Sequence, residues 1–364
     1  ADKAVLAALA DRKLSTIEMP FVIDRKDNGN KIVFSKMGIS MENITARLMW
    51  VPVEKTGMVR LAWEVYIIPK TTSDYWLVRV DAMNNSILDI DNLTTYCNWD
   101  HPAGQHDHST CNAAVNNADK NENSINFFDF NNQGKNEVQS TNSPLIVNSA
   151  SYRVIPFPAE SPIHPGGSPA LVSNPWTAAP GNATSLKWHT GLAGADYTYT
   201  RGNNVWAYED RLASNAGSLA KSASSTTTPD PLTFDFVPNF TLEPTVTTPT
   251  QNQQFNITNL FYWNNVIHDV MYQYGFNEVT GNFQDDNQGR GGAGNDHVNA
   301  EAQDGVGTNN ANFSTPNDGS SGRMQMFLWT APTPDRDGDV DNGIIVHEYG
   351  HGISNRFTGG PNVS

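Results

Sequence analysis

The chain has 364 residues, of which 38% are hydrophobic and 10% aromatic, and its formal net charge is −15. A chain of this length is typical of two globular domains rather than one. An acidic chain is repelled by phosphate backbones, so the composition argues against nucleic-acid binding. The sequence contains no apolar run of the roughly 18 to 20 residues that a membrane-spanning helix needs. We therefore expect neither a nucleic-acid partner nor a membrane partner.

Residues 1–95 are predicted to form a small α+β unit. The Ala and Leu content of residues 4–9 favours a short helix. Apolar residues then alternate with polar ones in residues 61–67 and 75–81, which is typical of strands with one buried face. A turn at Asn84-Asn85 precedes a third such run, residues 87–90. The three runs predict an antiparallel meander.

Residues 96–148 are rich in Asn, Asp, Ser and Lys and are predicted to form an exposed polar connector, the kind of segment in which proteases cut. Cys97 and Cys111 could close a loop of about 15 residues through a disulfide. Three histidines lie between them, so a second metal site is conceivable, although their spacing matches no zinc motif. A surface loop is the simpler interpretation, and whether the two cysteines pair is left open.

The following segment is predicted to be β-rich at first and then helical. Pro, Thr, Ser and aromatic residues separate short β-like runs from Tyr152 to Val246. Apolar residues then recur at spacings of three and four up to Tyr274, which predicts a helix that Gly275 would end. His268 lies on the apolar face of this helix. We expect it to be a buried, hydrogen-bonded histidine rather than a metal ligand.

A metal-binding pattern lies near the end of the sequence. His347 and His351 are four residues apart, so on a helix their imidazoles share one face and could bind one tetrahedral zinc ion. Glu348 could face the fourth coordination position and act as general base toward a zinc-bound water. The pattern is only five residues long, and an amphipathic helix with two surface histidines is the alternative.

Sequence similarity to a known family extends from Asn259 to Pro361. In order and spacing, this region resembles the catalytic domain of the fungalysin zinc metalloendopeptidases. The stretches that carry the resemblance are 261–269 (FYWNNVIHD), 274–283 (YGFNEVTGNF), 289–292 (GRGG), 309–313 (NNANF), 335–339 (DRDGD) and 358–361 (TGGP), together with the histidine motif. Residues 1–95 resemble the propeptide that fungalysins share in outline with thermolysin precursors. The resemblance implies an α+β protein, in which a small antiparallel-sheet propeptide domain precedes a thermolysin-like metallopeptidase domain.

The domain division that follows is a propeptide in residues 1–95, a connector with the processing site in 96–148, and the N-terminal part of the catalytic domain in 149–364. By the resemblance, His347 and His351 are zinc ligands and Glu348 is the general base. The family's third zinc ligand is a glutamate on a following helix. It would lie beyond Ser364, as would the C-terminal helical part of the fold. We therefore expect this chain by itself to lack a complete active site.

The resemblance also implies substrate and partner contacts. Asn310 and Ala311 resemble the start of the substrate-binding edge strand of thermolysin-like enzymes, which holds the peptide main chain. The expected partners are protein or peptide substrates and the chain's own propeptide as an intramolecular inhibitor, and the expected location is extracellular. The implied function is that of a secreted zinc endopeptidase precursor. A non-catalytic secreted binding module that retains the fold is the alternative.

Four aspartates, Asp335, Asp337, Asp339 and Asp341, alternate along the chain just before the histidine motif and resemble a calcium loop. A glycine stands at the fourth position rather than the sixth, and no glutamate stands at the twelfth, so the segment is not an EF-hand. Two interpretations are left open. One is a Ca²⁺ ion that stabilises the approach to the zinc helix, and the other is a solvated acidic turn.

Overall fold

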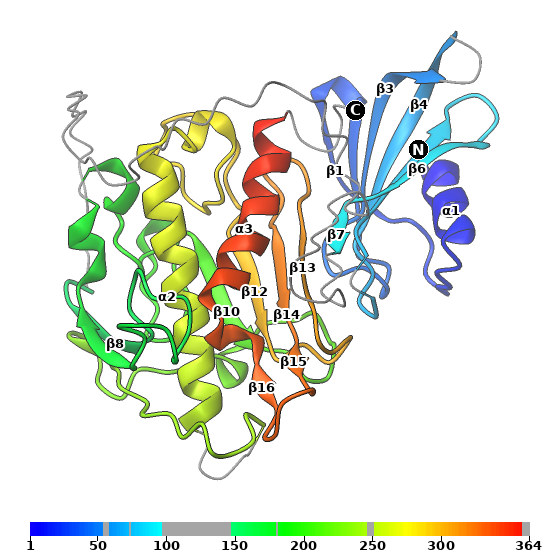
Figure 1. Ribbon diagram of the computed structural model, residues 1–364. Coiled ribbons are helices and arrows are strands. Elements are labelled where there is room, and N and C mark those ends of the chain that lie inside the picture. The colour runs from blue at the N-terminus through cyan, green and yellow to red at the C-terminus, as the bar shows by residue number, and fades with distance from the viewer. Residues whose placement is uncertain (54–57, 73, 97–146, 180, 246–250, 359–364) are drawn as a thin grey trace, which may run out of the picture.

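A computed structural model describes residues 1–53, 58–72, 74–96, 147–179, 181–245 and 251–358. The predicted connector, with Cys97 and Cys111, lies almost entirely outside the described residues. The protein is a mixed α+β structure with separate hydrophobic cores on the two sides of this segment. Figure 1 shows the N-terminal part beside the larger C-terminal part, which begins at Val147. The domain boundaries given above stay a prediction.

The N-terminal part is a six-stranded antiparallel sheet covered by one helix. The helix α1 (Asp2–Asp11) buries Ala4, Val5, Ala8 and Leu9 against the sheet, because these residues share one helical face. The predicted helix and the antiparallel meander are both confirmed. The strands, in spatial as well as chain order, are β1 (Val22–Lys26), β2 (Lys31–Phe34), β3 (Thr45–Val53), β4 (Met58–Ile67), β5 (Trp76–Asp81) and β6 (Ile87–Asn92).

The C-terminal part is built on short strands in three sheets. A three-stranded sheet contains β11 (Leu232–Phe234), β8 (Ala150–Val154) and β9 (Ala170–Ser173). A mixed five-stranded sheet has the order β10 (Val205–Glu209), β12 (Val298–Ala302), β14 (Arg323–Met326), β13 (Ala311–Ser314) and β7 (Thr94–Tyr96). A two-stranded ribbon contains β15 (Leu328–Trp329) and β16 (Arg336–Asp337).

Single 3-10 turns connect many of these elements: η1 (Asp27–Gly29), η3 (Pro175–Ala178), η4 (Asn182–Thr184), η5 (Leu192–Gly194), η6 (Leu219–Lys221), η7 (Glu278–Thr280) and η8 (Gly338–Val340). Short strands and turns fill the described residues from 150 to 245, so the prediction of an irregular β-rich segment is confirmed. Many Pro and Gly residues interrupt this segment, which explains why its strands stay short.

Two long helices pack on the five-stranded sheet, and Figure 1 shows them side by side in front of it. The first, α2 (Gln251–Gln273), contacts β8, β10 and β12, and it is buried over most of its length. The second, α3 (Asn342–Phe357), contacts β13 and β14 and carries the histidine motif. The predicted helix up to Tyr274 is confirmed, and Gly275 follows it with φ +99°, a conformation that favours glycine. No helix among the described residues has the length and apolar character needed to cross a bilayer.

One strand joins the two parts. The strand β7 follows β6 of the N-terminal sheet and pairs antiparallel with β13 of the C-terminal sheet, as Figure 1 shows. Beside this pairing, the hydroxyl groups of Thr94 and Ser314 lie 2.5 Å apart. The N-terminal part therefore contributes an outer strand to the sheet that packs against α3.

Candidate active site

The helix that carries the histidine motif is fixed at its start by a cap and by burial. The Asp341 carboxylate accepts a hydrogen bond from the backbone N–H of Ile344 at 3.2 Å, and such caps favour helix initiation. Ile345 and Tyr349 are buried against the sheet. A Cβ added at Gly352 would lie 2.7 Å from the Phe313 ring. Close packing therefore explains one glycine that helix propensity disfavours.

A buried arginine fixes the end of the same helix. The Arg356 guanidinium donates hydrogen bonds to the carbonyl of Gly281 at 2.9 Å and to the Asp296 carboxylate at 3.0 Å. It also reaches the carbonyls of Pro316 and Ser320. Burial raises the pKa of Asp296 to about 7, although Arg356 acts in the opposite direction. Both ends of α3 are thus tied to neighbouring loops, which fixes the orientation of the side chains between them.

The two histidines point their ring nitrogens at a common location. The Nε2 atoms of His347 and His351 lie 3.1 Å apart, and the ring planes are 89° apart with centroids 4.7 Å from each other. Two nitrogen ligands on one tetrahedral zinc ion, with bonds of about 2.0–2.1 Å, are separated by roughly 3.3 Å. Both rings are half-buried. The pair therefore fits a zinc ion without rearrangement of the helix.

Glu348 lies against the same two histidines. One ligand atom from each of the three residues lies within 4.8 Å of the others. The Glu348 carboxyl group is fully buried, and neither oxygen has a hydrogen-bond partner among the described residues. Burial raises the pKa of this carboxyl group well above its usual range. A buried carboxyl group without a donor is costly, so the geometry suits a residue whose partner is a ligand or a substrate.

A cavity of about 1000 Å³ opens beside His347. Its lining includes the apolar residues Val340, Ile344, Trp329 and Phe240. Such clefts with a few polar groups are the usual form of a ligand site. The arrangement can accept an apolar side chain next to the histidine pair.

Asn310 and Ala311 lie at the start of β13. The Asn310 carboxamide oxygen accepts a hydrogen bond from the Ala311 N–H at 2.9 Å, and Ala311 pairs with Met326 on β14. The pairing with β7 involves the later residues of the strand, from Asn312 on. Among the described residues, Ala311 has no strand partner on the β7 side. Their predicted role in substrate binding stays a prediction.

These residues are part of a sequence that matches a known family. A sequence model of the fungalysin metallopeptidases (M36) matches residues 151–364, more than half of the chain. The chain belongs to the fungalysin metallopeptidase family.

Curated relatives of this fungalysin chain include the proteins named extracellular metalloproteinase 2 of Trichophyton tonsurans and of Arthroderma benhamiae. Each is 44% identical over 215 residues, which are 59% of this chain and 32% of the relative. Extracellular metalloproteinase 3 of Trichophyton tonsurans is 43% identical over 216 residues, again 59% of this chain and 32% of the relative. The match therefore spans about a third of the length of these relatives.

The four aspartates before the zinc helix of the fungalysin chain do not form one group. Asp341 is the helix cap, and Asp335 is half-buried, with its backbone N–H bonded to Glu243. Asp337 and Asp339 are both buried at η8. No three of the four place ligand atoms within 4.8 Å of one another in the part of the chain that the structure describes. A calcium site made by all four is therefore not supported.

His268 is a buried histidine with two partners, as predicted. Its Nδ1 lies 3.0 Å from the Asp269 carboxylate and its Nε2 lies 2.9 Å from the Gln284 carboxamide oxygen. The Asp269 carboxylate also accepts a hydrogen bond from the Trp188 indole N–H at 2.9 Å. These bonds satisfy the ring inside the fold, so it is not available as a metal ligand.

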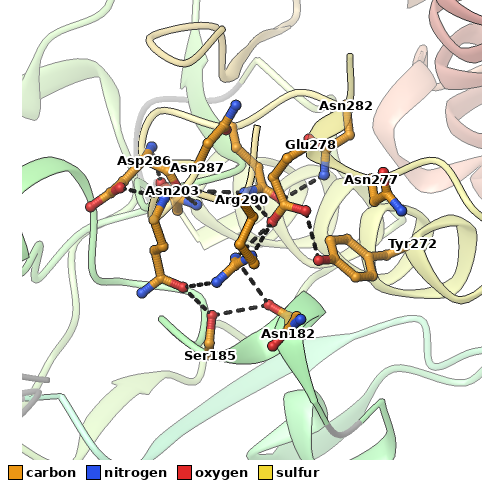
Figure 2. A network of polar contacts seen from close by, with 12 residues as sticks. Asn182, Ser185, Asn203, Tyr272, Asn277, Glu278, Asn282, Asp286, Asn287 and Arg290 are labelled. Atoms are coloured by element: carbon orange, nitrogen blue, oxygen red, sulfur yellow. Dashed lines mark hydrogen bonds and ion pairs between the residues drawn. The ribbon is translucent and has the colours of Figure 1, made fainter. Parts of the chain in front are cut away.

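A polar network holds the loop that follows α2 in the fungalysin fold (Figure 2). The Glu278 carboxylate accepts hydrogen bonds from the Tyr272 hydroxyl and from Arg290 Nε, both at 2.7 Å. Asn203 bonds the backbone N–H of Asp286 at 2.7 Å. In Figure 2, Tyr272 of α2 and residues of the loop 277–290 meet Asn203, which precedes β10, and Asn182 and Ser185 near η4. Their partners are one another, so the network positions the loop that meets Arg356 rather than a ligand.

Sequence analysis missed a group of three buried carboxylates, which we call the β12 carboxylate cluster: Asp210, Glu301 and Asp304. Oxygens of the three lie within 4.8 Å of one another. Burial raises the pKa of Glu301 well above its usual range, and it also raises the pKa of Asp304. Asp210 is about 90 residues before the other two in sequence, and the parallel pairing of β10 with β12 brings it to them. No local motif could have revealed the cluster.

Proposed function

We propose that the chain belongs to a secreted, zinc-dependent endopeptidase precursor that hydrolyses peptide bonds in protein substrates. The observation that carries the proposal is the histidine pair with Nε2 atoms 3.1 Å apart beside a fully buried Glu348 without a hydrogen-bond partner among the described residues. Membership in a metallopeptidase family and the names of the extracellular relatives support it.

Each residue of the motif has a distinct role in this proposal. His347 and His351 would hold the zinc ion. A bound zinc ion supplies Lewis-acid chemistry, which polarises the scissile carbonyl and acidifies the attacking water. Glu348 accepts the proton of that water at a carboxylate oxygen and then donates it to the leaving amine. Neither Glu348 oxygen accepts a hydrogen bond from a described residue, which leaves both oxygens available for these transfers.

The peptide main chain binds along the start of β13 in this proposal. Asn310 and Ala311 lie where an extended peptide can extend the sheet, because backbone hydrogen bonds at a sheet edge bind peptides without regard to sequence. The apolar cavity beside Ile344 and His347 then receives a substrate side chain.

The N-terminal part acts as an intramolecular inhibitor in this proposal, and cleavage falls in the connector, residues 96–148. Its strand β7 already pairs with β13, the strand at whose start the substrate is proposed to bind. Two further contacts reinforce this one. The guanidinium of Arg323 on β14 lies 4.6 Å from the Tyr75 ring, and Asn215, in the loop after β10, donates a hydrogen bond to the Lys70 carbonyl at 2.7 Å. An inhibitor held in this way blocks extension of the sheet until the connector is cut.

The test is Glu348→Gln in the full-length gene product, compared with the wild type. We expect both proteins to bind one zinc ion, and we expect the variant to lose casein hydrolysis by at least about 100-fold, because general base catalysis contributes 10²–10⁴-fold. Zinc content by elemental analysis and the unfolding temperature serve as controls. A wild type that binds no zinc, or a variant that cleaves casein equally well, would overturn the proposal in favour of a non-catalytic binding module.

A further inference from the structure

The turn η8 buries two carboxyl groups just ahead of the zinc helix, Asp337 and Asp339, which we call the η8 pair. The Asp339 side chain is 0% exposed, and neither of its oxygens has a hydrogen-bond partner among the described residues. Asp337 is 3% exposed and accepts hydrogen bonds from Asn256 Nδ2 and Gln303 Nε2, both at 2.6 Å. Neutral amides therefore surround the Asp337 carboxylate, and no N–H group reaches Asp339, whose carboxyl group lies against that of Asp337.

No basic side chain neutralises the η8 pair in the described part of the chain. Neither Asp337 nor Asp339 has an ion-pair partner among the described residues. The adjacent Arg336 donates instead to the carbonyls of Pro334 and Asp335, at 2.7 and 3.1 Å. Buried carboxylates are stable only when they are paired, protonated or bound to a metal. The pair thus requires either a proton or a cation from solution.

The surroundings favour a cation with oxygen ligands. Two carboxylates supply the charge, and calcium and magnesium prefer carboxylate, carbonyl and water oxygens. A cavity of about 20 Å³ adjoins Asp337 but not Asp339, and Asn252, Asn256 and Arg336 also line it. A space of about 10–15 Å³ is enough for one water molecule, so a water ligand has room to enter. Calcium accepts irregular ligand sets more readily than magnesium.

The β12 carboxylate cluster, which brings three carboxylates together, does not carry the same inference. Lys221 Nζ lies 2.7 Å from Asp210, and Arg323 Nε lies 3.9 Å from Glu301. Every carboxylate oxygen of the cluster accepts a hydrogen bond within the protein. Such a cluster has no need of an external cation.

We propose that Asp337 and Asp339 bind one calcium ion, independently of the zinc site and of the proposed peptidase activity. The ion stabilises the start of α3, because the Asn259 side chain of α2 connects the backbone of η8 with the first turn of that helix. Asn259 Nδ2 donates to the Asp339 carbonyl at 2.7 Å and to Asn342 Oδ1 at 2.8 Å, and Asn342 is the first residue of α3. Of the four aspartates in the sequence pattern, only these two are ligands.

The test measures calcium binding by the full-length gene product after removal of metals on a chelating resin and reloading with zinc. We expect one calcium ion to bind per chain in equilibrium dialysis and the unfolding temperature to rise by several degrees with calcium, since a ligand that binds only the folded state stabilises it. Asp339→Asn, which keeps the shape of the side chain, should abolish both effects. Asp335→Asn, a change at the neighbouring half-buried aspartate, should preserve both.

The proposal is overturned if the wild type binds no calcium, or if Asp339→Asn retains the calcium-induced rise in unfolding temperature. A proton shared by the η8 pair is the competing explanation. It predicts that the wild type loses stability as the pH rises and that calcium does not restore it. The wild-type dialysis result decides the question even if the variant fails to fold, because it does not depend on any substitution. Zinc content measured in the same samples separates this outcome from failure of the zinc site.

Discussion

The protein buries acidic groups in two places, and among the described residues only one of the two has basic side chains beside it. In the β12 carboxylate cluster, Lys221 and Arg323 supply positive charge from within the protein, and Arg323 is itself completely buried. In the η8 pair, two carboxyl groups of comparable burial have amide partners or none, and no basic partner among the described residues. The charge of the β12 carboxylate cluster is therefore compensated within the protein, whereas the η8 pair requires a proton or a cation from solution.

The position of each group explains the difference. The β12 carboxylate cluster lies under the N-terminal part, because Arg323 also donates a hydrogen bond to the Thr72 carbonyl at 3.4 Å and stacks on Tyr75. The Arg323 guanidinium both compensates the charge of these acids and contacts the N-terminal part. The η8 pair lies instead beside the cavity that adjoins α3. In our proposal, a calcium ion bound there makes the stability of the start of α3 depend on the calcium concentration of the solution.

The largest effect is expected from Arg323→Met, which leaves the β12 carboxylate cluster without its buried base. Removal of one partner from a buried ion pair typically costs about 3–5 kcal/mol, so we expect a loss of this order in the free energy of unfolding. Urea unfolding of the 364-residue chain measures it. Arg336→Met is the matched control, because within the described part of the chain its guanidinium donates hydrogen bonds only to the carbonyls of Pro334 and Asp335. Its cost should stay below about 1 kcal/mol. Equal costs for the two variants would mean that the two acidic regions do not differ as described.

The free energy of unfolding is expected to depend on pH through both groups of buried acids. Burial raises the pKa of Asp339 well above its usual range, and Asp337 adds to this effect. A carboxyl group whose pKa is higher in the folded state contributes most stability below its unfolded pKa, about 3.9, and loses it as the pH rises toward the folded pKa. We therefore expect the calcium-free chain to lose stability continuously from about pH 4 upward.

Burial also raises the pKa values of Glu301 and Asp304, so the β12 carboxylate cluster contributes a loss of the same sign. The two contributions differ in their response to calcium. Only the loss from the η8 pair should be reduced by calcium and by Asp339→Asn, as measured by unfolding free energies between pH 4 and pH 8. If calcium leaves the pH profile unchanged, the η8 pair holds a proton rather than a cation.

Local spacing explains what the sequence could predict. His347 and His351 share a helical face because they are four residues apart, and the alternation along β4 and β5 reports one buried face of a sheet. Both patterns depend on neighbouring residues only. The meander, α2 and the placement of the histidine motif on a helix followed from such spacing, whereas α1 followed from its Ala and Leu content and the fold class from the family resemblance. The roles of the motif residues and of Asn310 and Ala311 stay predictions.

Long-range pairing explains what the sequence could not predict. Thr94 and Ser314 are 220 residues apart, and no local pattern signals that β7 joins β13. Nothing in the sequence around Arg323 distinguishes it from an exposed charged residue. It is nevertheless fully buried, because the N-terminal part covers it. The alternating aspartates were visible, but alternation alone could not show that Asp341 caps a helix while Asp339 is buried. Burial and hydrogen-bond partners are properties of the fold, and they decide which acids can bind an ion.

The smallest effect is expected from Asp341→Ala, which separates the helix cap from the η8 pair. Loss of an N-cap residue costs about 0.5–2 kcal/mol, so we expect a decrease of about 1 kcal/mol in the free energy of unfolding. The calcium-induced rise in unfolding temperature should survive, because the Asp341 carboxylate is bonded to the Ile344 N–H and is not a ligand in our proposal. Asp341→Asn, which keeps a capping oxygen, should cost less than the alanine variant. Loss of the calcium response in both variants would extend the cation site to Asp341 and contradict the assignment of the two ligands.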